Sequence, residues 1–148
     1  MDSDAFARWW NALPLAPSEQ CLNTRLTGCD RDGMRVELAF DAPATFANAR
    51  GTVQGGFVTA MLDTCLGIPV LLATDGRKGP VSLQIAVSFL DAVQVGPVRG
   101  WGRVSRLGGS IAFVEAALID RNGQPLATAT QSAKLLPGPL ADADKETD

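Results

Sequence analysis

The order of apolar and polar positions predicts two main kinds of element in this chain of 148 residues. From Val53 to Ala73 nearly all side chains are apolar, which is typical of a helix enclosed by protein, and we expect this helix from about Gly56 to Ala73. The segment 81–89 alternates instead, with apolar side chains at odd positions, as a half-buried strand does. The sequence therefore predicts one long central helix with strands on either side of it.

The N-terminal part of the chain predicts a short helix and a hairpin. Ser3 can cap a helix that runs to about residue 11, before Pro14 and Pro17 end it. Two extended runs between residues 19 and 40 flank Asp32–Gly33 and indicate the first hairpin.

The C-terminal part predicts further strands, at 96–106, 111–120 and 125–136. The pair Asn122–Gly123 between the last two favours a type I′ turn. Pro69 interrupts the central helix, and we expect it to kink the helix or to end its regular part early.

This order of elements favours an α+β fold in which one antiparallel sheet packs on one main helix. We expect an N-terminal helix and linker at 1–17, the main domain at 18–137, and an acidic tail at 138–148. The tail is expected to be disordered because it has little to bury.

Composition and charge limit the partners. Hydrophobic residues make up 46% of the chain and charged residues 20%, a globular balance. The net charge is −3, and residues 141–148 alone carry that charge, so a nucleic-acid partner is not expected. A membrane span is not expected either, because Asp63 near the centre of the helix would cost about 2.5 to 3.5 kcal/mol.

The candidate chemistry is narrow because the chain has no histidine. This excludes Ser-His-Asp and Cys-His nucleophiles and HExxH zinc sites. Three cysteines without CxxC spacing support neither a disulfide framework nor a metal site, so we expect no metal and a reducing, cytoplasmic location. The acidic N-terminus, Met1 to Asp4, does not predict an export signal.

One face of the central helix differs from the rest. Gly56, Ala60, Asp63 and Gly67 form a stripe of small residues with a single carboxylate in it. Asp63 is either a structural carboxylate held by hydrogen bonds or a functional acid in a cleft. The Gly55–Gly56 helix start is either a tight turn or a site where exposed N–H groups stabilise an oxyanion.

The segment from Asn48 to Asp63, NARGTVQGGFVTAMLD, resembles the signature of the PaaI-like (phenylacetate-degradation type) hotdog-fold acyl-CoA thioesterases. In that signature an Asn and a His-Gly-Gly start precede an Asp or Glu on the helix, and Asn48, Gly55 and Asp63 have the family's spacing. The order of elements also matches from about residue 19 to residue 136, and the segment 109–113 looks like the family's start of a strand after a turn.

The resemblance implies the hotdog fold, with an antiparallel sheet wrapped around one long central helix. It implies a homodimer or homotetramer with active sites between subunits, so that Asp63 of one subunit faces the helix N-terminus of the other. The substrate would be an acyl- or aroyl-CoA, with no separate cofactor. Asp63 would be the nucleophile or the general base, and the Gly55 N–H would bind the oxyanion.

The resemblance also assigns roles to other residues. Asn48 would hold the water or the carboxylate, and Gln54 would be a further catalytic residue. The substrate-binding positions would be Gly56, Ser82, Gly109 and Ser110.

Gln54 departs from the family because it stands where the family has its usual histidine. A glutamine amide can donate a hydrogen bond to a carbonyl but cannot titrate. Three interpretations therefore stay open. The chain is a thioesterase in which Gln54 substitutes for the histidine, or a non-catalytic protein that binds acyl-CoA or another hydrophobic ligand. The third interpretation, a structural dimerisation domain, leaves Asp63 unexplained.

Overall fold

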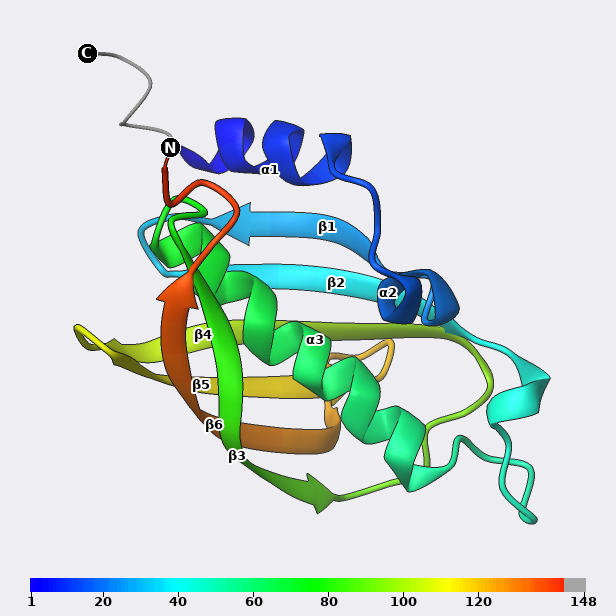
Figure 1. The fold of residues 1–148 in the computed structure, drawn as a ribbon. Coiled ribbons are helices and arrows are strands. Elements are labelled where there is room, and N and C mark those ends of the chain that lie inside the picture. Colours follow the sequence, from blue (N-terminus) through cyan, green and yellow to red (C-terminus); the bar gives the residue numbers. More distant parts are fainter. Residues whose placement is uncertain (143–148) are drawn as a thin grey trace.

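A computed structural model of the protein describes residues 1–142 and has the predicted hotdog architecture. One antiparallel six-stranded sheet, in the order β1-β2-β4-β5-β6-β3, curls around the long helix α3, as Figure 1 shows. The helices are α1 (Ser3–Ala12), α2 (Pro17–Cys21) and α3 (Gly55–Ala73), with a 3-10 turn at Ala44–Phe46. The strands are β1 (Arg25–Asp30), β2 (Arg35–Ala42), β3 (Lys78–Phe89), β4 (Gly96–Leu107), β5 (Ile111–Ile119) and β6 (Pro125–Pro137).

The core lies between α3 and the concave face of the sheet. Apolar residues on most sides of α3 are buried there, including Met61, Leu62, Leu66 and Leu72. By length and composition α3 could cross a membrane, but more than half of its residues are buried within the protein, as in the core helix of a globular domain. The enclosed helix expected from its continuous apolar sequence is therefore present.

The N-terminal segment differs from its prediction in two ways. Asp2 caps α1, with its side chain accepting a hydrogen bond from the Ala5 N–H, whereas Ser3 accepts one from the Arg31 N–H. The hairpin does not begin at residue 19, because residues 17–21 form α2. Phe6 of α1 is fully buried in the same core as α3, so α1 is an integral part of the packed domain.

The helix does not end early at Pro69. It continues as an α-helix to Ala73, and a close approach between α3 and β4 accompanies the proline. Pro69 has no N–H to donate to the Cys65 carbonyl four residues earlier. That carbonyl oxygen lies against Gly102 of β4, at a point only 1.6 Å from where a Cβ on Gly102 would be. The missing side chain at residue 102 therefore lets the helix backbone rest directly on the sheet.

Strand β3 does not keep the uninterrupted alternation that its sequence suggests. Ser82 pairs with Ala133 and Gln84 with Ser132, so the register shifts at Leu83. This bulge reverses which positions face inward. Val81 and Leu83 are 48% and 59% exposed, and Ser82 faces the helix, which contradicts the prediction of a single inward face at odd positions.

The last hairpin and the C-terminal tail also differ from expectation. A type I′ turn needs positive φ at both central residues, but within residues 1–142 this holds for Gly123 and not for Asn122. The Asp120 carboxylate shapes the turn by accepting hydrogen bonds from two backbone N–H groups. Residues 138–142 are not a disordered tail, because Gly138 and Leu140 donate backbone hydrogen bonds to the 76–77 segment. The remaining part of the predicted tail, 143–148, lies outside the described residues.

Candidate active site

Asp63, Ser82 and Gln131 form a polar cluster on the concave face of the sheet. They come from α3, β3 and β6. The Ser82 hydroxyl donates to Asp63 Oδ1 at 3.0 Å, and Gln131 Nε2 donates to Ser82 Oγ at 2.6 Å. Gln131 Nε2 also lies 3.4 Å from Asp63 Oδ1. The carboxylate is thus held through one oxygen, whereas Asp63 Oδ2 has no hydrogen-bond donor within residues 1–142.

The local structure explains why these three side chains meet. The bulge at Leu83 turns Ser82 toward α3, and Gln131 takes an inward position on β6. Its inward neighbours on that strand are small, Ala129 and Ala133, which leaves room for the glutamine beneath the helix. Gln131 was not among the site residues predicted from the sequence. The available signal was a glutamine at a position where the alternation of β6 puts alanine and leucine.

A second group lies at the N-terminus of α3. Gln54 is the N-cap residue, and its side-chain Oε1 accepts a hydrogen bond from the Gly56 N–H at 2.9 Å. Within residues 1–142 neither the Gly55 N–H nor Gln54 Nε2 has an acceptor. The exposed Phe89 ring lies beside Gly55, about 3.3 Å from the position that a Cβ would take. Two hydrogen-bond donors and an apolar ring therefore meet at the positive end of the helix dipole.

Other expected site residues lie apart from both groups. The Asn48 side chain is engaged within its own loop, where Oδ1 accepts from the N–H groups of Arg50 and Thr52. Gly109 and Ser110 lie in the turn between β4 and β5. The Gly109 carbonyl accepts from Lys78 Nζ at 2.8 Å, and the Ser110 carbonyl accepts from the Leu135 N–H at 2.8 Å. The structure does not bring these residues to Asp63 within one chain.

The carboxylate and the helix N-terminus are also separated from each other. Asp63 follows Gly55 by eight residues, which corresponds to about 12 Å along a helix axis. A single carbonyl group cannot contact both within one chain. The two groups can act together only if a second chain supplies one of them.

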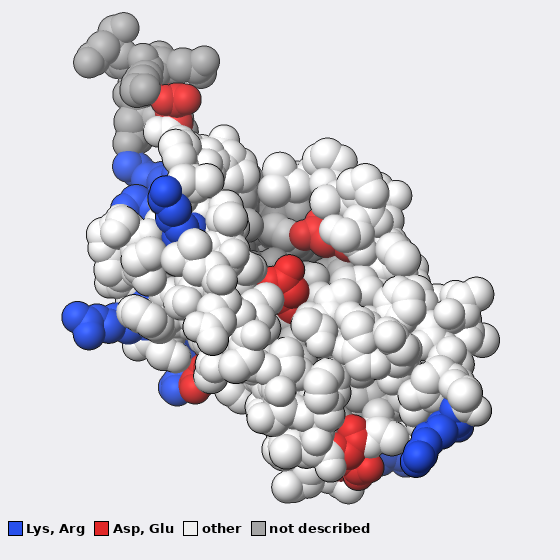
Figure 2. All heavy atoms as spheres, turned by 60° about the horizontal axis from the view of Figure 1, so that its bottom comes forward, with Lys and Arg blue, Asp and Glu red and all other residues white. Residues whose placement is uncertain are grey.

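Strand β3 offers a surface for a second chain. It is an edge strand of 12 residues whose other side has no partner strand within residues 1–142. Exposed apolar side chains follow this edge, namely Val81, Leu83, Phe89 and Leu90. Figure 2 shows a largely uncharged face on this side of the molecule, with acidic groups near its middle and basic groups toward its rim. A long edge strand with apolar side chains is a template for pairing with another chain.

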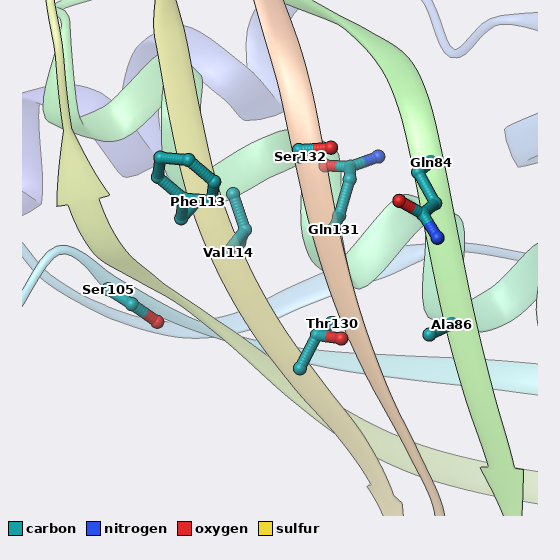
Figure 3. Close-up of a pocket in the computed structure, with 8 residues that line it drawn as sticks. All are labelled: Gln84, Ala86, Ser105, Phe113, Val114, Thr130, Gln131 and Ser132. Atoms are coloured by element: carbon teal, nitrogen blue, oxygen red, sulfur yellow. The ribbon is translucent and has the colours of Figure 1, made fainter.

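The convex face of the sheet carries a hollow of about 380 Å³. Figure 3 shows Phe113, Thr130 and Gln84 over the strands, with α3 behind the sheet. Gln131 also contributes to its lining, but neither Asp63 nor Gly55 does.

Metal and thiol chemistry find no support among the described residues. No three His, Cys, Asp or Glu side chains gather there in a way that could hold a metal ion. Burial raises the pKa of the Cys65 thiol well above its ordinary value, so this buried cysteine is not a ready nucleophile.

These features define a class of protein: a hotdog domain with a carboxylate on its central helix and free donors at the helix start. The sequence profile of the thioesterase superfamily matches residues 50–127, and the chain belongs to this family. Its fold is that of the PaaI-like hotdog thioesterases. No match was found among curated protein sequences.

Solved structures agree with this assignment. A putative thioesterase from Ralstonia eutropha JMP134, described as phenylacetic acid degradation-related, is 28% identical with a TM-score of 0.80, over 87% of this chain and 98% of that one. The PaaI protein of E. coli, from the phenylacetic acid degradation operon, is 15% identical with a TM-score of 0.72, over 90% and 91%. A hypothetical thioesterase from Streptococcus pneumoniae TIGR4, solved with coenzyme A, is 20% identical with a TM-score of 0.69, over 78% and 90%.

Proposed function

We propose that the protein hydrolyses acyl-CoA or aroyl-CoA thioesters at a site shared by two subunits of a homodimer. Asp63 of one subunit supplies the carboxylate, and the Gly55 N–H of the other stabilises the oxyanion. One observation carries the proposal. Within residues 1–142, Asp63 is held through Oδ1 and its Oδ2 has no donor, and the same helix begins with a Gly55 N–H that has no acceptor. A base and an oxyanion donor are the two groups that thioester hydrolysis requires.

The shared site follows from the separation along α3. A two-fold axis at the free edge of β3 would join the two sheets and set the two α3 helices in opposite directions. Asp63 of one helix would then approach the Gly55 end of the other, closing the gap of about 12 Å. The apolar residues on the β3 edge would be buried in the same interface, and pairs of such dimers would give the homotetramer.

The residues at the helix start suit a developing oxyanion. The Gly55 N–H and the Gln54 Nε2 group are both donors, and the Phe89 ring lies beside Gly55. In the general-base route, Asp63 takes a proton from water as the water attacks the thioester carbonyl carbon, the carbonyl oxygen becomes the oxyanion, and the carbon–sulfur bond then breaks as the proton passes from Asp63 to the leaving coenzyme A thiolate. In the nucleophilic route, Asp63 attacks that carbon itself, coenzyme A leaves as the carbon–sulfur bond breaks, and water then hydrolyses the mixed anhydride to free Asp63 and the acid. Asn48 orders the loop before the helix and helps to hold the water.

Coenzyme A thioesters are the proposed substrates because the family and one structural relative support them. The Streptococcus pneumoniae thioesterase was solved with coenzyme A bound. The Ralstonia and E. coli relatives are both tied by their descriptions to phenylacetic acid degradation, which favours including aromatic acyl groups among the substrates tested.

A thiol-release assay over short, medium and aromatic acyl-CoA thioesters tests the proposal. The native protein should release coenzyme A, and Asp63→Asn should lower kcat by about 10² to 10⁴. Asp32→Asn, in the exposed turn between β1 and β2, is the matched control and should keep the native rate. Hydrolysis that survives in Asp63→Asn would refute the assigned role of this carboxylate.

A non-catalytic acyl-CoA-binding protein is the second candidate, and Gln54 is the observation that favours it. Its amide oxygen caps the Gly56 N–H, and an amide cannot move a proton as a histidine can. The binder interpretation predicts saturable binding of acyl-CoA without product in the native protein and turnover in Gln54→His. The thioesterase interpretation predicts turnover in the native protein.

A further inference from the structure

We propose that Gln131 is a positioning residue that aims the Ser82 hydroxyl at Asp63 and thereby fixes the carboxylate for reaction. The inference rests on the proposed thioesterase function and adds to it a residue on β6 that does not touch the reacting atoms. Its basis is the cluster in which Gln131 Nε2 lies 2.6 Å from Ser82 Oγ and 3.4 Å from Asp63 Oδ1.

The direction of each hydrogen bond follows from counting donors and acceptors. An ionised carboxylate only accepts, so the end of the Gln131 amide nearest to Asp63 must be its NH₂ group. The same NH₂ group donates to Ser82 Oγ and occupies a lone pair of that oxygen. The hydroxyl proton of Ser82 is then left to point at Asp63 Oδ1, 3.0 Å away.

The opposite amide orientation would disrupt this arrangement. It would place Gln131 Oε1 beside the carboxylate and would offer Ser82 a second acceptor for its proton. The Ser82 hydroxyl could then turn away from Asp63, and the carboxylate would lose its support. The ionised Asp63 and the glutamine amide therefore hold each other in one orientation.

The Gln131 side chain contributes little to the stability of the fold. Only 4% of the residue is exposed, and its Oε1 is buried without a hydrogen-bond partner within residues 1–142. A buried acceptor without a partner is unfavourable for folding, and such groups in native proteins call for another explanation. A role in holding the catalytic carboxylate explains the buried glutamine, because the site needs only the NH₂ end of its amide.

The consequence for Asp63 is a fixed rotation about its side chain. With Oδ1 engaged by Ser82 and approached by Gln131, Oδ2 is the oxygen left for water or for the substrate. Loss of this support should lower the rate of the chemical step more than the affinity for substrate, since catalytic geometry tolerates little displacement.

Gln131→Met tests the proposal because methionine keeps the length of the side chain and removes both polar ends. We expect kcat to fall about tenfold or more with KM changed less than about twofold. The melting temperature should stay equal or rise, because the unpaired buried oxygen is gone. Gln84→Met is the matched control on the convex face, beside β6, and should keep the native kcat. Native kcat in Gln131→Met would overturn the proposal, as would a kcat loss accompanied by a lower melting temperature.

A double-mutant cycle separates positioning through Ser82 from a direct effect. In a Ser82→Ala background, Gln131→Met should change kcat less than about threefold, because the hydroxyl through which it acts is absent. An equal loss in both backgrounds would overturn the assigned route. Gln131→His, which keeps a donor, should recover part of the rate.

A measurement without turnover keeps this inference distinct from the proposed function. The side-chain amide signal of Gln131 in a nitrogen-15 NMR spectrum should move in both Asp63→Asn and Ser82→Ala. An unmoved signal would refute the cluster even in an active enzyme. Moved signals in a protein that hydrolyses no thioester would support the cluster and refute the thioesterase proposal.

Discussion

Gly102→Ala tests the close approach that sets the height of α3 above the sheet. The added Cβ would lie 1.6 Å from the Cys65 carbonyl oxygen and 2.6 Å from its carbon, both backbone atoms. Ordinary contact begins at 3.4 Å, so the helix would have to move away by nearly 2 Å at a point only two residues from Asp63. Overpacking of a core typically costs about 1 to 3 kcal/mol, and a backbone clash of this size belongs at or above the upper end.

Urea unfolding followed by circular dichroism measures this cost. Gly102→Ala should lower the free energy of unfolding by about 3 kcal/mol or more, and it should also lower turnover because Asp63 moves away from Ser82. Gly109→Ala is the control for stability, because nothing lies within 4 Å of its added Cβ and its φ is not positive. Equal stability of the native protein and Gly102→Ala would refute the close approach and the account of Pro69 that depends on it.

Substitutions at Asp75, Gln54, Gly67 and Leu83 test other contacts of the fold. Partial burial alone would raise the pKa of Asp75, but hydrogen bonds from the N-terminal ammonium and Arg31 outweigh it and hold the pKa below its ordinary value. Asp75→Asn should therefore cost up to about 1 kcal/mol at pH 7, and unfolding measured against pH should show the difference vanish as pH falls below about 4. Gln54→Ala removes the cap of α3 and should lower the melting temperature, with a cost of about 1 kcal/mol. Gly67→Ala, where the added Cβ meets Pro80 Cγ at an ordinary 3.7 Å, should stabilise the helix by about 0.5 to 1 kcal/mol in urea unfolding. Leu83→Lys places a charge on the free edge of β3 and should shift the protein toward monomers in sedimentation experiments; an unchanged assembly would contradict pairing at this edge.

The fold was predictable from the sequence because its strongest patterns are local. The continuous apolar run of α3 and the turn residues between strands indicate an enclosed helix within an antiparallel sheet. Features that depend on distant partners were not visible. The contact between Gly102 and the Cys65 carbonyl joins residues far apart in the chain, so the effect of Pro69 could not be worked out from local rules. The bulge at Leu83 was hidden because the residues around it alternate as a regular strand would.

The candidate site was predictable in its parts but not in its assembly. The spacing of Gly55 and Asp63 predicts the two groups proposed as oxyanion donor and catalytic carboxylate, and Ser82 was expected near them. That the two halves lie about 12 Å apart along one helix follows only once the helix is known to be continuous. Gln131 was missed because its contact with Ser82 depends on the register between β3 and β6, which the bulge shifts.

Subunit complementation tests the shared thioesterase site most directly. Gly55→Pro removes the N–H that we propose stabilises the oxyanion, at the first position of α3, where proline is tolerated. Gln54 already has the extended conformation that precedes a proline. Gly55→Ala is the control that adds a Cβ but keeps the N–H. Asp63→Asn and Gly55→Pro should each be inactive alone.

Mixed dimers of Asp63→Asn and Gly55→Pro, co-expressed with two different affinity tags, contain one complete site and one doubly defective site. The account predicts that a randomly mixed population regains about a quarter of the native thiol-release rate, and purified heterodimers about half. Inactive heterodimers would contradict the account, because they would mean that Asp63 and Gly55 do not act across the interface on one thioester.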